Sequence, residues 1–190
     1  MSEHAVESSK PHPATSGWVL VAYASAAGST AGIAERIARG IGRTGHAVAC
    51  EPADRADLVG VEALVLGSAV HDMAWLPSAS DLLRRTAVAG IPVWCFSVGA
   101  VQPRGPLTRL MARLEAQRVA AGFPPGVLVR DHQVFRGVVR LRGVPWWGRL
   151  VYRAMSGRPG DHRDWAAVDR WAARVAAELA QEGRPHQNSD

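Results

Sequence analysis

The chain has 190 residues, of which 47% are hydrophobic and two are cysteine. This composition predicts one domain with a full apolar core that needs no disulfide or metal to stabilise it. The formal net charge is +5, and no apolar run approaches the ~18 residues of a membrane span, which excludes a transmembrane segment.

The two ends of the chain differ in composition from the rest. Residues 1–16 are polar and lack the apolar stretch of a secretory signal, so we expect a disordered tail there. We expect a second, frayed tail over 183–190 and one domain over 17–182. Cys50 and Cys95 have apolar neighbours and are predicted to be buried thiols of a reduced, cytoplasmic protein.

Strand-like and helix-like segments alternate between these tails. The apolar run over 18–24 predicts a buried strand, and isoleucines every four residues over 29–41 predict an amphipathic helix. Further strands are expected over 46–51, 62–69, 91–98 and 126–139, and further helices over 78–88, 106–121 and 165–180. This alternation predicts an α/β fold, a doubly wound parallel sheet with helices on both faces.

Three of these helices carry more specific expectations. Ser78 or Ser80 is the predicted N-cap of the helix over 78–88. The helix over 106–121 has an apolar face made of Leu107, Leu110, Met111 and Leu114. The closing helix has an apolar stripe made of Trp165, Val168, Ala172, Val175 and Leu179.

The turn between the first strand and the first helix has the features of an anion site. Backbone N–H groups at a helix N-terminus, with the positive end of the helix dipole behind them, bind phosphate without any basic side chain. Gly28 allows a backbone conformation that brings the chain close to a ligand. Residues with hydroxyl groups lie on both sides of this glycine. We therefore expect phosphate to be bound by Ser25, Ala26, Ala27, Gly28, Ser29 and Thr30.

Other phosphate loops fit this turn poorly. A Walker A loop requires lysine, which the turn lacks. The dinucleotide fingerprint requires three glycines at fixed spacing, whereas the turn offers Gly28 and Gly32. An ordinary tight turn between strand and helix is the remaining alternative to a monophosphate site.

The pattern S-x-x-G-x-T resembles the phosphate loop of flavodoxins. Small-residue loops also follow the third and fourth strands, beginning at Gly67 and Ser97, where flavodoxins bind their flavin. The resemblance implies a flavodoxin-like fold with five strands in the order 2-1-3-4-5 and FMN as the non-covalent cofactor. It implies that the isoalloxazine ring is bordered by Ser68, Ala69, Val70, His71, Trp75, Ser97, Val98, Gly99 and Ala100.

Two side chains of these loops have more than one possible role. Trp75 is a candidate for stacking on the ring, and its alternative role is to cap the following helix. His71 is a candidate for tuning the flavin or relaying a proton, and its alternative is an ordinary surface histidine. The seven histidines show no metal-ligand spacing and no catalytic triad is visible, so we assign neither a metal site nor catalytic residues.

Residues 136–160 form a long basic and aromatic insert with six arginines and no acidic residue. It is predicted to be a packed loop with a solvated arginine face, a membrane-surface patch, or a lip that pairs with substrate carboxylates. No nucleic-acid-reading motif accompanies the insert, so nucleic acid is not an expected partner. The residues of the substrate or membrane lip are Arg136, Arg140, Arg142, Trp146, Trp147, Arg149 and Arg153.

The closing segment Gly160-Asp-His-Arg-Asp-Trp165, with Met155-Ser-Gly before it, resembles menaquinone-dependent protoporphyrinogen IX dehydrogenases of the flavodoxin-like family, above all their actinobacterial branch. The enterobacterial enzymes differ where this chain has His71-Asp-Met-Ala-Trp75. The resemblance implies a flavin-dependent oxidoreductase with a quinone or small-molecule redox substrate, cytoplasmic or peripheral on the inner face of the membrane. The alternatives are a soluble electron carrier or flavin reductase, which the basic charge disfavours, and a member that does not bind FMN.

Overall fold

The structure, a computed structural model, describes residues 17–99, 106–139 and 160–182. Both predicted tails, most of the insert and Ala100 lie outside these residues. The elements are β1 Trp18–Ala24, α1 Ser29–Gly42, β2 Val48–Pro52, β3 Val61–His71, β4 Ala74–Trp75, α2 Pro77–Ala89, β5 Pro92–Gly99, α3 Pro106–Ala121, β6 Leu128–Arg136, β7 Val138–Val139, β8 Gly160–Asp161 and α5 Trp165–Glu182.

The main sheet has the order β2-β1-β3-β5-β6, and all of these neighbours are parallel. The five predicted strands and their order 2-1-3-4-5 are therefore confirmed, with the fourth and fifth now labelled β5 and β6. One further strand, the short β4, pairs antiparallel with the end of β3. The strand predicted over 126–139 is divided after Arg136, and its last residues form β7, which pairs with β8.

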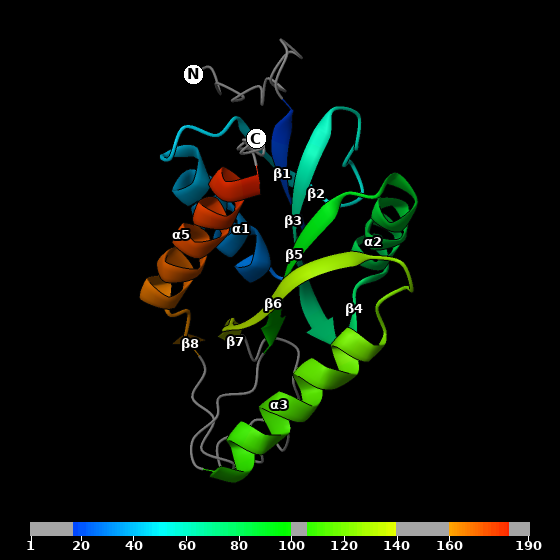
Figure 1. The fold of residues 1–190 in the computed structure, drawn as a ribbon. Helices are drawn as coiled ribbons and strands as arrows, with labels where there is room; N and C mark the ends of the chain where they lie inside the picture. The colour runs from blue at the N-terminus through cyan, green and yellow to red at the C-terminus, as the bar shows by residue number, and fades with distance from the viewer. Residues whose placement is uncertain (1–16, 100–105, 140–159, 183–190) are drawn as a thin grey trace, which may run out of the picture.

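Helices cover both faces of the sheet, as the sequence predicted. α1 and α5 lie together on one face and α2 lies on the other (Figure 1). Apolar side chains of β1, β3 and β5 alternate between these faces because successive strand residues point to opposite sides. Val21, Val65 and Phe96 thus pack with α1 and α5, whereas Leu20 and Leu66 pack with α2.

The beginning of α2 differs from the predicted one. The helix starts at Pro77, and its N-cap is Leu76 in an extended conformation, without a side-chain cap. Proline favours the first helical position because its φ is already helical and its missing N–H needs no partner there. The predicted caps Ser78 and Ser80 are therefore wrong.

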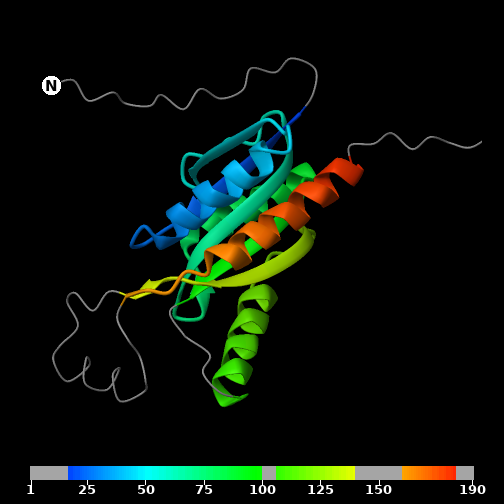
Figure 2. The same ribbon diagram turned by 90° about the vertical axis from the view of Figure 1, so that its left-hand side faces the viewer.

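Leu110 and Leu114 of the predicted apolar face of α3 are exposed and do not join the core. Leu110 is 52% exposed and Leu114 is 44% exposed, while the helix points away from the sheet beyond the end where β3 and β5 finish (Figures 1 and 2). Near its C-terminal end, Val119 joins the core beneath α2. By contrast, the stripe of α5 is buried from Val168 to Leu179, with Trp165 partly buried at its start.

Candidate functional site

The carboxyl ends of β1, β3 and β5 bring the three predicted loops to one edge of the sheet. Ala24 pairs with Ser68 and Ser68 pairs with Ser97, so the three strands end at the same level. A Cβ atom added to Gly137 would lie 2.9 Å from Val98 Cγ1 and 3.4 Å from Ser29 Oγ. The first and third loops therefore converge next to Gly137, at the edge where ligands bind in open α/β sheets.

The turn before α1 has the conformation that the sequence predicts. Gly28 is the N-cap of α1 with a φ of 85°, a left-handed conformation that glycine adopts without steric cost. Its N–H donates to Ser25 Oγ at 3.0 Å, which closes the turn. A Cβ at Gly28 would meet no atom within 4 Å, so the backbone conformation rather than crowding favours glycine.

The first turn of α1 is open to an anion. Within the described chain, no side chain caps the helix and no acidic residue lies in its first turn. Ala26, Ala27 and Gly28 are exposed, so a ligand can approach the backbone at this end of the helix. Backbone N–H groups at a helix N-terminus carry the positive end of the helix dipole and bind phosphate oxygens.

Thr30 provides the strongest indication of a ligand at this turn. Its side chain is 0% exposed, and its hydroxyl group has no hydrogen-bond partner among the described residues. A buried hydroxyl without a partner costs about 1–3 kcal/mol, so native proteins rarely retain one. A phosphate oxygen at the start of α1 would accept this hydrogen bond, and the residues present therefore fit the expected FMN phosphate.

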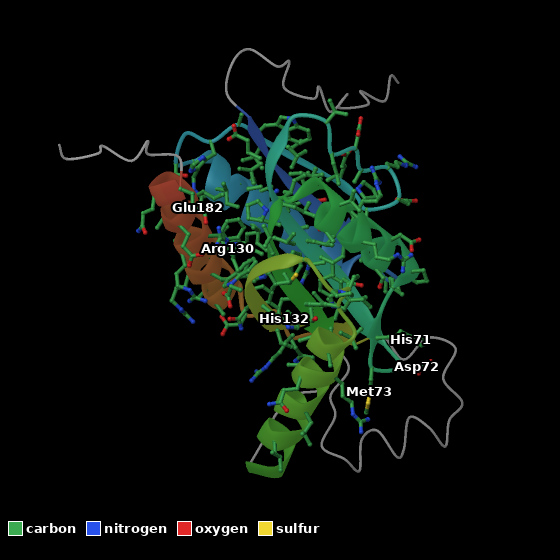
Figure 3. All side chains as sticks on the ribbon, turned by 45° about the vertical axis from the view of Figure 1, so that its right-hand side comes forward. His71, Asp72, Met73, Arg130, His132 and Glu182 are labelled. Carbon is green, nitrogen blue, oxygen red and sulfur yellow. The ribbon has the colours of Figure 1, made fainter. Side chains whose placement is uncertain are left out.

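The second loop forms a tight turn between β3 and β4. Ser68 is buried, where its hydroxyl donates to Ala69 O at 2.9 Å and accepts from Leu76 N at 3.0 Å. Asp72 and Met73 have φ values of 50° and 60°, which non-glycine residues adopt rarely. Figure 3 shows His71 and Asp72 on this turn, where both are exposed and His71 Nε2 lies 3.5 Å from Asp72 Oδ2.

Trp75 does not have the position expected of a residue that stacks on the ring. The indole is buried, its Nε1–H donates to Ser97 Oγ at 2.8 Å, and its ring lies 4.7 Å from that of Phe123. This arrangement anchors β4 to β5 beneath α2 and leaves the indole no open face. The predicted stacking is therefore not supported, and Leu76 rather than Trp75 is the N-cap of α2.

The residues predicted to begin the third loop, Ser97 to Gly99, are the last residues of β5, and the rest of that loop lies outside the described residues. Ser97 and Val98 are buried, and Gly99 is half-buried. Gly99 O accepts from Gly137 N at 3.0 Å, which links the end of β5 to the end of β6. Ser97 Oγ also lies 2.8 Å from His132 Nε2. His132 is not among the residues that the sequence predicts for the site, because its neighbours along β6 give no indication of what it contacts across the sheet.

The segment over 160–165 contains a cluster of charged and aromatic side chains. Trp165 contacts two arginines, with the guanidinium of Arg163 4.4 Å and that of Arg36 5.2 Å from its ring centre. Arg163 also contacts α1, since a Cβ at Gly32 would lie 2.7 Å from its Nη1. The cluster, which the sequence did not predict, joins the segment before α5 to the first turns of α1.

Two carboxylates complete this cluster. Arg36 forms a bidentate pair with Asp169 at 2.7 Å for both bonds. Arg163 donates to Asp161, and this hydrogen bonding lowers the pKa of that carboxyl to about 2. Bidentate arginine–carboxylate pairs fix direction as well as distance, so the cluster orients β8 and α5 relative to the phosphate turn.

The remaining predicted residues divide between described and undescribed parts of the chain. Arg136 is exposed at the end of β6, whereas Arg140, Arg142, Trp146, Trp147, Arg149 and Arg153 lie outside the described residues.

Burial raises the pKa of the Cys50 thiol to about 12 and also raises that of Cys95, so neither is a reactive thiolate. The described residues contain no metal-binding group and no helix able to cross a membrane.

Comparison with known protein families places this geometry in context. The model of the family described as "Flavodoxin domain" matches residues 20–164, which include all three loops. No curated protein matches the chain. The family match agrees with FMN as the expected cofactor.

Solved structures match the fold at low sequence identity. The Flv1 flavodiiron core from Synechocystis has a TM-score of 0.54 and 16% identity, over 89% of this chain and 37% of its own. A flavodoxin from the domain Archaea has a TM-score of 0.50 and 16% identity, over 85% and 98%. Oxidised Flavodoxin 2 from Bacillus cereus has a TM-score of 0.50 and 19% identity, over 87% and 99%. The chain thus spans little more than a third of the flavodiiron chain and nearly all of each flavodoxin.

Proposed function

The chain belongs to the flavodoxin domain family, and we propose that it binds FMN non-covalently and uses the flavin for electron transfer. The unpartnered buried hydroxyl of Thr30 at the start of α1 is the observation that carries this proposal. The flavin supplies the redox chemistry, while the protein supplies position and electrostatics. Residues 25–30 would hold the phosphate through backbone N–H groups and hydroxyls, and the loops after β3 and β5 would border the ring.

A pair of isosteric substitutions tests the phosphate site. Thr30→Val removes the hydroxyl without changing the shape of the side chain, so FMN affinity should fall about tenfold, the scale of one hydrogen bond to a charged group. The flavin-free variant should be as stable as the wild type or more stable, because an unpartnered polar group has been removed. Flavin titration by fluorescence quenching and urea unfolding would measure the two effects.

The matched control is Thr44→Val. Thr44 lies beyond the other end of α1, where its hydroxyl donates to Ile41 O at 2.7 Å. This variant should lose stability and retain FMN affinity, the opposite of the Thr30 variant. Wild-type affinity in a folded Thr30→Val protein would contradict the phosphate assignment.

The flavin that heat releases from the protein should have the mass of FMN. Release of FAD would contradict a monophosphate site.

For the reaction, we propose a quinone-coupled flavin dehydrogenase that acts on protoporphyrinogen IX or a similar reduced substrate. Its support is the resemblance of the 160–165 segment, together with the contact between Arg163 in that segment and the first turn of α1. Oxidation of protoporphyrinogen IX by the FMN-loaded protein with a menaquinone analogue tests this activity. Flavin reduction without porphyrinogen turnover would instead favour an electron carrier or flavin reductase.

A further inference from the structure

Three side chains from three strands, two of them buried and one half-buried, form a hydrogen-bonded chain at the flavin edge of the sheet. Trp75 Nε1 in β4 donates to Ser97 Oγ in β5 at 2.8 Å. Ser97 Oγ lies 2.8 Å from His132 Nε2 in β6. Trp75 belongs to the segment that follows β3, and Ser97 lies near the carboxyl end of β5. The hydrogen-bonded chain therefore connects two groups of residues expected to border the ring to β6, where Figure 3 shows His132.

The direction of each hydrogen bond follows from the donors and acceptors available. An indole N–H only donates, so Ser97 Oγ accepts from Trp75. The serine hydroxyl has one hydrogen to donate, and His132 Nε2 in a neutral ring accepts it. The ring then carries its hydrogen on Nδ1. This arrangement satisfies Trp75 and Ser97 together at buried positions, where an unsatisfied polar group is costly.

We propose that neutral His132 is a positioning residue for the flavin, because through Ser97 and Trp75 it holds the β3–β4 turn and the carboxyl end of β5 in the arrangement that binds the isoalloxazine ring. This inference rests on the proposed FMN function and assigns a regulator to the same site. His132 acts through its neighbours and is not assigned a contact with the flavin. No electron or covalent bond is transferred along the chain.

Protonation of His132 would reverse the hydrogen bond between its Nε2 atom and Ser97 Oγ. The imidazolium has N–H groups on both nitrogens, so Nε2 would donate to Ser97 Oγ instead of accepting from it. Ser97 Oγ would then accept from two donors, and its own hydrogen would lose the acceptor that it has in the neutral chain. FMN binding and proton binding therefore oppose each other, and by linkage each weakens the other by the same factor.

The surroundings of His132 keep the ring neutral. Burial lowers its pKa from the usual value, although the Asp131 carboxylate acts in the opposite direction. Asp131 accepts from the backbone N–H of His132 and from Trp171 Nε1. The other contacts of the ring among the described residues are with uncharged groups: the rings of Trp75 and Phe123, and Cys95 opposite His132 in β5. Arg118, near the end of α3, instead contacts Met73 Sδ at 3.1 Å.

The first test uses the flavin-free protein. The Nε1–H resonance of Trp75 and the ring 15N shifts of His132 are followed by NMR from about pH 8 to about pH 5, the range in which histidines titrate. Both signals should change together, with a midpoint below that of an ordinary histidine. In Ser97→Ala the His132 ring should still titrate, whereas the Trp75 signal should no longer follow it.

The second test measures FMN affinity over the same pH range. His132→Gln retains a side-chain oxygen that can accept from Ser97 but does not titrate in this range. The FMN phosphate itself titrates near pH 6 and affects the affinity of both proteins. The test therefore compares the pH-dependent change in FMN affinity of the wild type with that of His132→Gln. Affinity should fall at least about threefold more in the wild type than in His132→Gln on going to the lower pH. His46→Gln, a control at the opposite end of the sheet before β2, should behave like the wild type.

The outcomes separate this inference from the proposed function. FMN binding with the same pH dependence in the wild type and His132→Gln would overturn the positioning role and leave FMN binding intact. A His132 titration that leaves the Trp75 resonance unchanged would overturn it as well. Absence of FMN binding by the wild type at every pH would overturn both. A loss of affinity at low pH that is at least about threefold smaller in His132→Gln than in the wild type, together with coupled NMR titrations, is the supporting result.

Discussion

Gly67 is required for packing of the core, although it lies next to the residues that are expected to border the flavin. It pairs with Phe96 across β3 and β5, and a Cβ at this position would lie 1.9 Å from Phe96 Cζ. Glycine therefore leaves the space that the Phe96 ring occupies. That ring packs against Phe135 and Trp171, each at 5.9 Å, in the core between the sheet and α5.

A methyl group at Gly67 should therefore destabilise the protein. We expect Gly67→Ala to lower the free energy of unfolding by about 1–3 kcal/mol, as overpacked cores do. The matched control is Gly42→Ala at the end of α1, where a Cβ would meet nothing within 4 Å. That variant should raise stability by up to about 0.5–1 kcal/mol, because alanine loses less backbone entropy than glycine. Urea unfolding measures both changes, and equal stability of Gly67→Ala and wild type would contradict the packing argument.

At the scale of elements, the sequence predicted those features that depend on local periodicity. The apolar run of β1 and the four-residue spacing in α1 agree with the strand and helix found there. The conformation of the turn from Ser25 to Thr30 was also predictable, because glycine at position 28 favours the left-handed backbone found there. The order of the five parallel strands followed from the family resemblance, which the sheet confirms.

Features that depend on distant contacts were not predictable in this way. β4 has two residues and exists because it pairs with β3, so no periodicity indicates it. The roles of Trp75 and His132 depend on a serine that lies 22 residues from one and 35 from the other. The amphipathic pattern of α3 indicated a helix but not where its apolar face would lie, and Leu110 and Leu114 are in fact exposed.

At the scale of the whole molecule, the net charge of +5 and the arginine-rich insert suggest attraction to anionic surfaces. We expect the protein to bind anionic vesicles more strongly than neutral ones, since each arginine near such a surface contributes about 1 kcal/mol. Added salt should weaken this binding, because attraction fades within about 8 Å at physiological ionic strength. Vesicle co-sedimentation at two salt concentrations measures both effects.

A variant of the insert separates lipid binding from substrate binding. Replacement of Arg140, Arg142, Arg149 and Arg153 by Ser should remove vesicle binding and leave FMN bound, because the phosphate turn lies elsewhere in the chain. Retained turnover with a water-soluble acceptor would indicate docking, whereas loss restricted to a carboxylated substrate would indicate a substrate lip. Equal sedimentation of the wild type with anionic and neutral vesicles would refute the membrane interpretation.

The packing of α5 has a consequence for how the protein is made. This helix is the last described element in the chain, yet it covers the face of the sheet that carries Val21, Val65 and Phe96. Domains generally form as their residues leave the ribosome, so this apolar face stays partly uncovered until α5 has been synthesised. Nascent chains stalled before α5 should therefore be the forms that chaperones bind and proteases remove.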